Sequence, residues 1–539
     1  MFEVNAIIEY FVVAACTALL YALCTYRLLG ALQQAGYDGK QLKKWMVRKG
    51  NMTRSRYTLL AFLIALSVAV FGLCFSFAGK LTAFVALLPI PLFTALYCAT
   101  DKKSLKVPLR VTRRVARIYL FVVLLLFAAA FALVLCGNAA AYYSGNVFAA
   151  RLRYLLLSIL PLAFGAIVRL ANACEKPFSA HRNQKYLRAA KTKLDAAPCV
   201  KIAVAGSCGK TSVKNFLAKM LSARYRVLFS PESYNTPLGI AKTVEKENLS
   251  DYDFFIAETG ARRAGEIAEL CALVSPDHCI LTGVCPQHVE TFGSIECVMR
   301  TKYEVFEGTK KGGFAVVGQD ENTKKFGELP NDLVCIAVGD GCDYGAFDVV
   351  RSKDGTEFTL ALGSERIRVR TKLLGEHNAR NLALAAAMAY RLGIGAESIT
   401  ETIAEMPYVT HRLQPIQAGG VLVLDDAYNA NVRGAAEAVE VLRLFDGKKA
   451  IVTPGLVELG ILQEEENAAF GARLAGLDLV ILVGATLVGA VKNGYLANGG
   501  DPEKLRVVPT LKDAQDLLSK FLCSGDTVLF LNDLPDIYA

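Results

Sequence analysis

One continuous stretch, Lys201–Ser212 (KIAVAGSCGKTS), constrains the fold of this chain more than any other. Residues of high β propensity lead into a Gly-x-x-Gly-Lys-Thr turn, and apolar residues then recur at helical spacing. In such a strand–turn–helix unit, successive backbone N–H groups point at one spot at the positive end of a helix, which favours bound phosphate. The stretch predicts a variant P-loop in an α/β fold, since the strict pattern would place glycine at Val204. A tight turn that carries a surface lysine is the alternative.

Each residue type in this turn suits phosphate. Gly206 and Gly209 let the backbone approach the phosphate oxygens. Lys210 brings a positive charge to the outer phosphates, and Thr211 offers a hydroxyl to Mg²⁺. The predicted nucleotide-binding residues of the turn are Gly206, Ser207, Gly209, Lys210, Thr211 and Ser212.

Hydrophobic residues make up 53% of the chain, and the excess lies before about residue 172. The candidate membrane spans are Val4–Tyr26, Tyr57–Gly79, Leu81–Thr100, Ile118–Leu135 and Tyr154–Val168. The first four have the length that a bilayer core requires, roughly 20 residues. The fifth is short and contains Pro161, so it is tilted, buried or interfacial. We therefore predict an α-helical membrane domain with about five spans.

Basic residues are concentrated in two of the segments between these stretches, 27–56 and 101–117. The positive-inside rule places both segments in the cytoplasm, together with everything after Glu175. Glu3 and Glu9 at the start, and the hydrophobic stretches that follow, disfavour a cleaved signal peptide. We expect a multi-pass cell-membrane protein whose catalytic domains are cytoplasmic.

The net charge of +10 is explained by this topology and by attraction to anionic lipids. A lipid bilayer is thus an expected partner, and nucleic acid is not, because the soluble half has no basic patch interleaved with aromatic residues. The 15 cysteines form no CxxC pair and no zinc-type spacing. A cytosolic catalytic half implies reduced thiols. We interpret Cys208 as a small turn residue; the alternative is a thiol that makes the site sensitive to alkylation.

After a basic, partly helical linker, apolar strands alternate with helices, as in a parallel α/β sheet. One predicted strand, DFFIAETG, ends on Glu258, and the next, HCILTGVCPQHVE, ends near His288. Ligands of open parallel sheets bind beyond the carboxyl ends of the strands. We therefore expect Glu258 and His288 to face Thr211 in a Mg²⁺ site, although each alone is more often a structural polar residue.

A later helix, LLGEHNARNLALAAAMAYRLG, begins with His377, Asn378 and Asn381, which are also suited to hydrogen bonds at a helix start. A new strand–helix alternation follows MPYVTHRLQPI and is long enough for a separate domain. The predicted domains are a transmembrane helical domain at 1–172, a linker at 173–198, a P-loop domain with a mainly parallel sheet at 199–412, and a C-terminal Rossmann-like α/β domain at 413–539.

A set of motifs in this order resembles the Mur ligases. They are AGSCGKTS, SYNTPLG, ETGARRAGEI, GVCPQHVETFGS, RTKYEVFEG, GEHNARNLALAA, HRLQPI and DDAYNANV. The likeness covers roughly residues 198–470 and is more specific than the P-loop alone.

This resemblance implies an ATP- and Mg²⁺-dependent ligase of bacterial peptidoglycan synthesis. ATP would phosphorylate a muropeptide carboxylate, and an amino acid or dipeptide, with D-Ala-D-Ala as the expected amine, would displace the phosphate. The implied catalytic residues are Lys210, Lys302 and His288. The implied metal-binding residues are Thr211, Glu258, His288 and a carbamylated Lys302. The implied nucleotide-binding residues outside the turn are Asn378, Asn381, Arg412 and Asp426.

The physical logic supports these roles. Phosphoryl transfer to a carboxylate gathers several negative charges, which lysine, Mg²⁺ and backbone dipoles must neutralise. Closure of two domains around ATP would exclude water from a hydrolysable acyl phosphate. A carbamate would turn Lys302 into an anionic metal ligand, whereas the alternative is a surface lysine on a helix.

The chain also departs from the family. Membrane spans stand where family members carry a domain that binds the UDP part of the precursor. Cys208 replaces the usual P-loop asparagine, Val432 replaces a proline, and the C-terminal sequence GDTVLFLNDLPDIYA lacks the expected Lys-Gly-Ser-Arg-like ending. We therefore hypothesise a membrane-associated acceptor, such as a lipid-linked muropeptide.

Three other functions remain open at this stage. A membrane transport ATPase would use the P-loop to drive movement through the spans, but it leaves DDAYNANV and Lys302 unexplained. A ligase-like scaffold would have no turnover, so that Lys210→Ala would be silent in cells. A ligase for another acceptor, poly-amino acid or folate-like, would keep the ATP chemistry.

Overall fold

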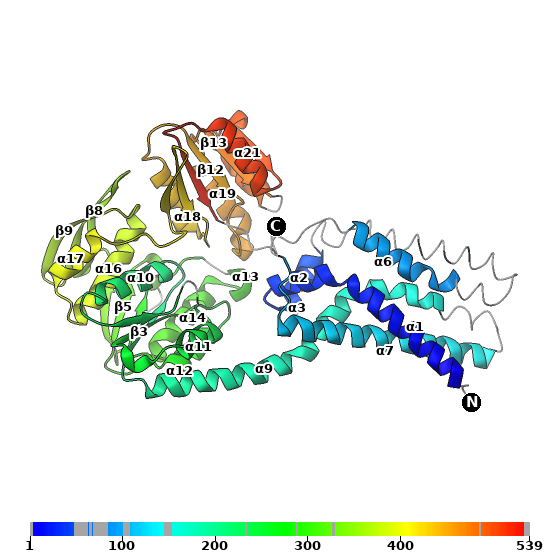
Figure 1. The fold of residues 1–539 in the computed structure, drawn as a ribbon. Helices are drawn as coiled ribbons and strands as arrows, with labels where there is room; N and C mark the ends of the chain where they lie inside the picture. The colour runs from blue at the N-terminus through cyan, green and yellow to red at the C-terminus, as the bar shows by residue number, and fades with distance from the viewer. Residues whose placement is uncertain are drawn as a thin grey trace. The chain divides into compact units, whose positions relative to one another are not determined.

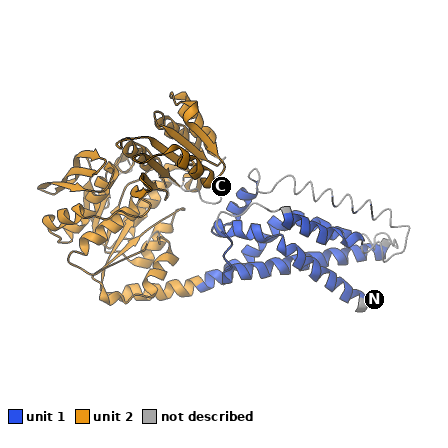
Figure 2. Cartoon of the chain, turned by 45° about the horizontal axis from the view of Figure 1, so that its top comes forward, with its two compact units in different colours: residues 1–182, 534–539 blue, residues 183–533 orange. Residues whose placement is uncertain are grey.

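The computed structural model describes residues 4–47, 63, 67, 70, 85–100, 108–144, 154–231, 234–286, 289–325, 329–428, 430–484 and 487–532. These residues form two compact units, one before residue 183 and one from residue 183 onward (Figure 2).

The first unit is helical because its apolar residues come in long runs rather than in the alternation of a half-buried strand. Its helices are α1 (Val4–Leu23), α2 (Tyr26–Gln34), α3 (Gly39–Val47), α6 (Pro89–Thr100), α7 (Arg113–Ser144), the 3₁₀-helix η1 (Leu156–Ala163) and the first part of α9 (Phe164–Ala196). Tyr21, Ile118 and Leu126 belong to one buried core. Large apolar side chains also face outward, since Phe11 and Leu120 are each 56% exposed. Such outward faces are what a helix in lipid needs.

Three helical segments are long and apolar enough to cross a membrane: Ala6–Leu23, Arg113–Tyr143 and Leu156–Ala196. They overlap the first and fifth predicted spans and include the fourth. The third predicted span contains α6, which is a shorter apolar helix, and the second lies outside the described residues apart from Leu63, Ser67 and Val70. These helices qualify as membrane spans by their length and composition, and the membrane location stays a prediction.

Helix α9 is continuous through the segment expected to be a partly helical linker. Near its middle, Glu175 is buried and accepts hydrogen bonds from Arg114 and Arg117 of α7, with the Arg117 Nη2–Glu175 Oε1 distance at 2.6 Å. These two ion pairs fix α9 to α7 and compensate for burying the carboxylate.

The second unit contains a nine-stranded sheet in the order β2-β3-β1-β4-β5-β6-β7-β8-β9. Figure 1 labels β3, β5, β8 and β9 of this sheet. The strands from β2 to β7 pair in parallel, and β7, β8 and β9 form an antiparallel meander. The strands are β1 (Val200–Ala205), β2 (Val227–Phe229), β3 (Phe254–Glu258), β4 (His278–Leu281), β5 (Phe314–Gly318), β6 (Val334–Val338), β7 (Tyr344–Ser352), β8 (Gly355–Leu362) and β9 (Glu365–Thr371).

Helices cover both faces of this sheet because alternate strand residues are buried on opposite sides. Ile202 and Val204 pack with α10 and α16 on one face, whereas Ala203 and Ala205 pack with α12 and α14 on the other. The helices are α10 (Lys210–Leu221), α11 (Pro237–Glu245), η2 (Leu249–Asp251), α12 (Glu266–Val274), α13 (Val289–Phe292), α14 (Ile295–Glu307), α15 (Glu321–Lys325), α16 (Glu376–Arg391) and α17 (Ala396–Ala404).

A six-stranded sheet follows in the order β10-β11-β15-β12-β13-β14, in which only the β10–β11 pair is antiparallel among the described strands. Its strands are β10 (Gln414–Ala418), β11 (Val421–Asp426), β12 (Lys449–Thr453), β13 (Leu479–Val483), β14 (Leu505–Val508) and β15 (Thr527–Leu531). The helices are α18 (Val432–Leu442), η3 (Gly460–Leu462), α19 (Gln463–Arg473), α20 (Val488–Ala497), η4 (Pro502–Lys504) and α21 (Leu511–Phe521). Two α/β domains with mainly parallel sheets, as predicted, therefore make up the second unit.

Candidate active site

The predicted P-loop connects β1 to α10. Gly206 and Gly209 have φ of +140° and +79°, a region that favours glycine. Steric packing also requires glycine, because a Cβ at Gly206 would overlap the Thr282 hydroxyl and one at Gly209 would overlap the Asn381 carboxamide. The turn therefore needs glycine at both positions.

Two polar residues of this turn, Lys210 and Ser207, differ in their hydrogen bonds. The Lys210 ammonium donates hydrogen bonds to the carbonyls of Gly206 and Ser207 at 2.8 and 3.1 Å. Burial lowers the pKa of Lys210, although Glu258 favours its charged form. The buried Ser207 hydroxyl has no hydrogen-bond partner among the described residues. An unpartnered hydroxyl beside a lysine at the start of a helix fits a bound phosphate.

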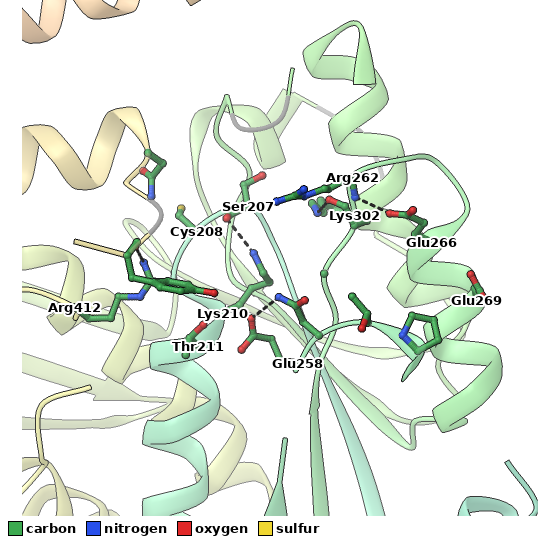
Figure 3. A pocket seen from close by; sticks show the side chains of 18 residues that line it. Ser207, Cys208, Lys210, Thr211, Glu258, Arg262, Glu266, Glu269, Lys302 and Arg412 are labelled. Atoms are coloured by element: carbon green, nitrogen blue, oxygen red, sulfur yellow. Dashed lines mark hydrogen bonds between the residues drawn. The ribbon is translucent and has the colours of Figure 1, made fainter. Parts of the chain in front are cut away.

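A cavity of about 310 Å³ opens beside the turn (Figure 3). Predicted residues from four places in the sequence line it: Thr211 from α10, Glu258 from β3, Lys302 from α14, and Arg412 from the segment that joins the two α/β domains. A neighbouring cavity of about 120 Å³ shares Gly209, Thr211 and Arg412, and is also lined by Ser212, Asn381 and Asp426. The structure thus brings most of the predicted residues to one place.

Glu258 is held by two residues that the sequence alone did not single out. It is the last residue of β3 and is 1% exposed. Lys214 Nζ donates to its Oε2 at 3.0 Å, and Asn235 Nδ2 donates to its Oε1 at 3.1 Å. Burial by itself would raise the pKa of Glu258, but Lys214, Lys210 and these hydrogen bonds lower it. Glu258 is therefore an ionised carboxylate in a fixed position.

This buried pair gives a stability prediction. Lys214→Ala should lower the free energy of unfolding by about 3–5 kcal/mol, because it leaves Glu258 buried without its cation. Lys311→Ala is the matched control: its pairing with Asp332 is largely exposed, and the variant should unfold like the parent. Chemical denaturation of the three proteins measures the difference. Equal unfolding midpoints for Lys214→Ala and the parent would contradict the prediction.

Lys302 lies on α14 with 2% of its surface exposed, so it is no surface lysine. Its Nζ donates to the Ala261 carbonyl at 3.5 Å and lies 5.8 Å from the centre of the Phe292 ring. Burial, followed by repulsion from Lys210, lowers the pKa of Lys302 to about 7. Near neutral pH the amine is therefore partly uncharged, which is the state that can react with carbon dioxide.

Arg412 lies at the junction of the two α/β domains. Its Nη1 donates to the Tyr428 carbonyl at 2.6 Å, and its guanidinium lies 4.9 Å from the centre of the Tyr428 ring. The junction has two non-glycine residues with positive φ, His411 (59°) and Leu413 (47°). Such conformations persist only where neighbouring contacts hold them.

The carboxylates that hold this junction lie at the end of β11. His411 Nδ1 lies 2.7 Å from Asp425 Oδ2, and the Leu413 N–H donates to Asp426 Oδ1 at 3.2 Å. Burial raises the pKa of Asp426 to about 6, against the opposing effect of Arg412. Asp426 is thus a half-buried carboxylate that faces the cavity and the junction together.

The two predicted asparagines of α16 lie in different surroundings. Asn381 lines the smaller cavity beside Gly209, whereas Asn378 is buried and its Nδ2 donates to the Leu374 carbonyl at 2.9 Å. The Asn378 amide is thus engaged in a local hydrogen bond at the start of α16. His377 Nδ1 is buried without a hydrogen-bond partner among the described residues, and burial lowers the pKa of this imidazole to about 4.

The predicted metal site is described in part. Strand β4 ends at Leu281 rather than near His288, because the chain turns at Gly283 (φ +138°), and His288 itself lies outside the described residues. Among the described residues, no three His, Cys, Asp or Glu side chains gather to hold a metal ion. Thr211 and Glu258 do line one cavity, and their oxygens suit a Mg²⁺ ion whose shell is completed by phosphate and water.

Comparison with known proteins places this arrangement in a family. The Mur ligase middle domain matches residues 204–389, and the Mur ligase glutamate ligase domain matches residues 411–532. The chain therefore carries the middle and C-terminal domains of the Mur ligase family, which confirms the predicted resemblance.

The similar proteins include several ligases of one type. Over 301 residues the chain is 33% identical to the UDP-N-acetylmuramoyl-tripeptide–D-alanyl-D-alanine ligase of Escherichia coli, a match that covers 53% of this chain and 65% of that relative. The crystal structure of MurF from Acinetobacter baumannii is similar with a TM-score of 0.59 and 26% identity, over 65% of this chain and 77% of that one. The MurF ligase from Thermotoga maritima in complex with ADP is similar with a TM-score of 0.59 and 25% identity, over 66% and 81%.

Proposed function

We propose that this chain is an ATP-dependent ligase of peptidoglycan precursor synthesis, which joins D-alanyl-D-alanine to the carboxylate of a muramoyl tripeptide. The observation that carries the proposal is the cavity that the P-loop, Glu258, Lys302 and Arg412 share. A relative that carries this activity in its name, and a similar structure that holds ADP, support it further.

The residues of the cavity supply what such a reaction needs. The P-loop amides and Lys210 bind and orient the phosphates of ATP. Thr211 and Glu258 would hold Mg²⁺, which neutralises phosphate charge when it is bound. Arg412 adds a second cation from the domain junction, so the site is complete only when both α/β domains contribute. Enclosure by both domains keeps water from the activated carboxylate.

Two features favour a ligase over a transport ATPase. A transport ATPase has no need of the C-terminal ligase domain, yet this domain matches the family and Arg412, at its edge, lines the cavity. A transport ATPase also has no need of a buried lysine in the cavity beside the P-loop. Lys302 is such a lysine.

We propose further that the protein resides in the bacterial cell membrane, with its catalytic unit in the cytoplasm, and that its acceptor is a lipid-linked muramoyl peptide. The three long apolar helices support the membrane location. The chain ahead of the family match is this helical unit, and a membrane-bound enzyme meets lipid-linked substrates at high local concentration.

A product assay with the full chain in lipid nanodiscs tests both proposals. ATP, Mg²⁺ and D-alanyl-D-alanine are supplied with either UDP-linked or lipid-linked muramoyl tripeptide, and mass spectrometry follows the products. We expect an amide product together with ADP and phosphate, and more product from the lipid-linked acceptor. ATP hydrolysis that no acceptor stimulates would favour the transport ATPase, and efficient use of the UDP-linked acceptor alone would contradict the lipid-linked one.

Arg412 gives a kinetic prediction. Arg412→Ala should raise KM for ATP about tenfold or more, the loss expected for one charged hydrogen bond. Arg366→Ala removes a surface arginine that bonds only nearby carbonyls in β9 and its turn, and it should leave KM unchanged. Initial rates at varied ATP measure both. A normal KM in Arg412→Ala would mean that Arg412 does not contact the nucleotide.

A further inference from the structure

Two cysteines meet where the P-loop packs against the segment after β4. Cys208 is half-buried in the turn, and Cys285 is 7% exposed. Both side chains line a cavity of about 730 Å³. Backbone contacts join the same two segments: the Ser207 N–H donates to the Gly283 carbonyl at 2.9 Å, and the Thr282 hydroxyl donates to the Cys208 carbonyl. The two cysteines thus lie on adjoining segments and line the same cavity.

The surroundings make one of these thiols reactive. The hydrogen bond with Cys285 lowers the pKa of Cys208; burial opposes this, and Lys210 and Arg433 add to the lowering. The same hydrogen bond and burial raise the pKa of Cys285. By contrast, burial raises the pKa of Cys271 and Cys279 to about 12, as expected of inert core thiols. A thiolate with a second thiol beside it is the arrangement found in redox-sensing cysteine pairs.

We propose that Cys208 and Cys285 form a reversible disulfide that weakens nucleotide binding at the P-loop, a role that rests on the proposed use of ATP there. With hydrogen peroxide as the oxidant, the Cys208 sulfur attacks one peroxide oxygen, the O–O bond breaks, and the departing hydroxide takes a proton to become water. The Cys285 sulfur then attacks the sulfenic sulfur and loses its proton, and the S–O bond breaks to give a second water. Two thiols are oxidised to one disulfide while peroxide is reduced to water.

The bond should disturb the turn because the turn is tightly packed on the side that faces the segment after β4. A disulfide brings two sulfurs to about 2.05 Å, much closer than a hydrogen bond does. Gly206 is already packed so tightly that a Cβ would overlap Thr282. The turn or the facing segment must therefore shift, and a binding constellation tolerates shifts of only about 0.5 Å.

Bound nucleotide should in turn protect the thiols. Cys208 also lines the cavity that Lys210 and Thr211 line. Phosphates bound in that cavity would therefore lie next to Cys208. If the disulfide weakens nucleotide binding, linkage requires that nucleotide disfavour the disulfide by the same factor.

Peptide mapping and calorimetry of the full chain test this inference. The reduced protein is treated with hydrogen peroxide, with or without ADP and Mg²⁺, and digested without reductant. We expect a cross-linked peptide pair that joins residues 208 and 285, less of it when ADP is present, and a loss of ADP binding that dithiothreitol reverses. Absence of this cross-link, or a cross-link with unchanged ADP binding, would overturn the inference.

Two variants sharpen the test. Cys285→Ser should form no cross-link, and its Cys208 sulfenic acid should persist and react with dimedone, whereas the parent should not be labelled there. Cys523→Ser removes an exposed cysteine outside the pair and should behave as the parent does. A protein that binds no ADP even when reduced would refute the proposed function, while the peptide map would still decide whether the two thiols pair.

Discussion

Lys210→Ala is expected to lower kcat of the proposed ligation by about 10²–10³-fold, the effect of removing one group that stabilises transition-state charge. Lys210 is the P-loop lysine, and its ammonium lies against the carbonyls of Gly206 and Ser207, where a phosphate would compete for it. Alanine removes the positive charge that moves with the transferring phosphoryl group. Product formation from ATP, D-alanyl-D-alanine and the acceptor, followed at saturating substrate, measures the loss.

The fold should survive this change, so that lost activity reports on chemistry. Lys210 bonds to carbonyls of its own turn, and α10 keeps the packing of Val213, Phe216 and Leu217. Lys246→Ala, an exposed lysine at the end of α11, is the matched control and should retain parental activity. A Lys210→Ala protein that is folded, binds acceptor and turns over at the parental rate would contradict the assignment of this lysine to catalysis.

Local patterns were sufficient to predict the P-loop and the position of Glu258. The glycines, Lys210 and Thr211 are adjacent in sequence, and their conformation follows from the strand and the helix on either side. Glu258 ends a buried apolar run, and carboxyl ends of neighbouring parallel strands meet at one edge of a sheet. In both cases the chemistry depends on short-range order, which a single sequence carries.

Contacts that depend on strand order could not be predicted in this way. Lys214 pairs with Glu258 because β3 lies next to β1, although 44 residues separate the two side chains. Cys208 meets Cys285 because β4 lies on the other side of β1. Neither neighbour follows from spacing along the chain.

The two asparagines of α16 show a different limit. The Mur ligase resemblance implied that Asn378 and Asn381 both contact the nucleotide. The helix begins at Glu376, however, and Asn378 lies in its first turn, where its amide bonds the Leu374 carbonyl. Only Asn381 reaches the P-loop, against Gly209. The position of the helix start determines which asparagine lies against the P-loop, and patterns place helix ends poorly.

Lys302→Ala should reduce ligation by about 10²-fold or more, and short carboxylates such as formate or acetate should restore part of it. The Mur ligase resemblance implies that Lys302 acts as a carbamate, that is, as an anionic oxygen ligand for a metal ion. The structure makes this chemistry available, because Lys302 is buried and its pKa is lowered to about 7, so its amine is partly uncharged at neutral pH. Removing the side chain leaves a gap next to Thr211 and Glu258 that a small carboxylate can enter.

Lys302→Arg separates the carbamate from a simple need for positive charge. Arginine keeps a cation at this position but forms no carbamate under these conditions and fills the gap that the added carboxylate needs. We therefore expect Lys302→Arg to be as inactive as Lys302→Ala and to show no rescue. Activity measured against carboxylate concentration distinguishes the variants. If arginine sustains turnover, or if Lys302→Ala is fully active without added carboxylate, Lys302 serves this cavity as a cation or as a packing residue rather than as a metal ligand.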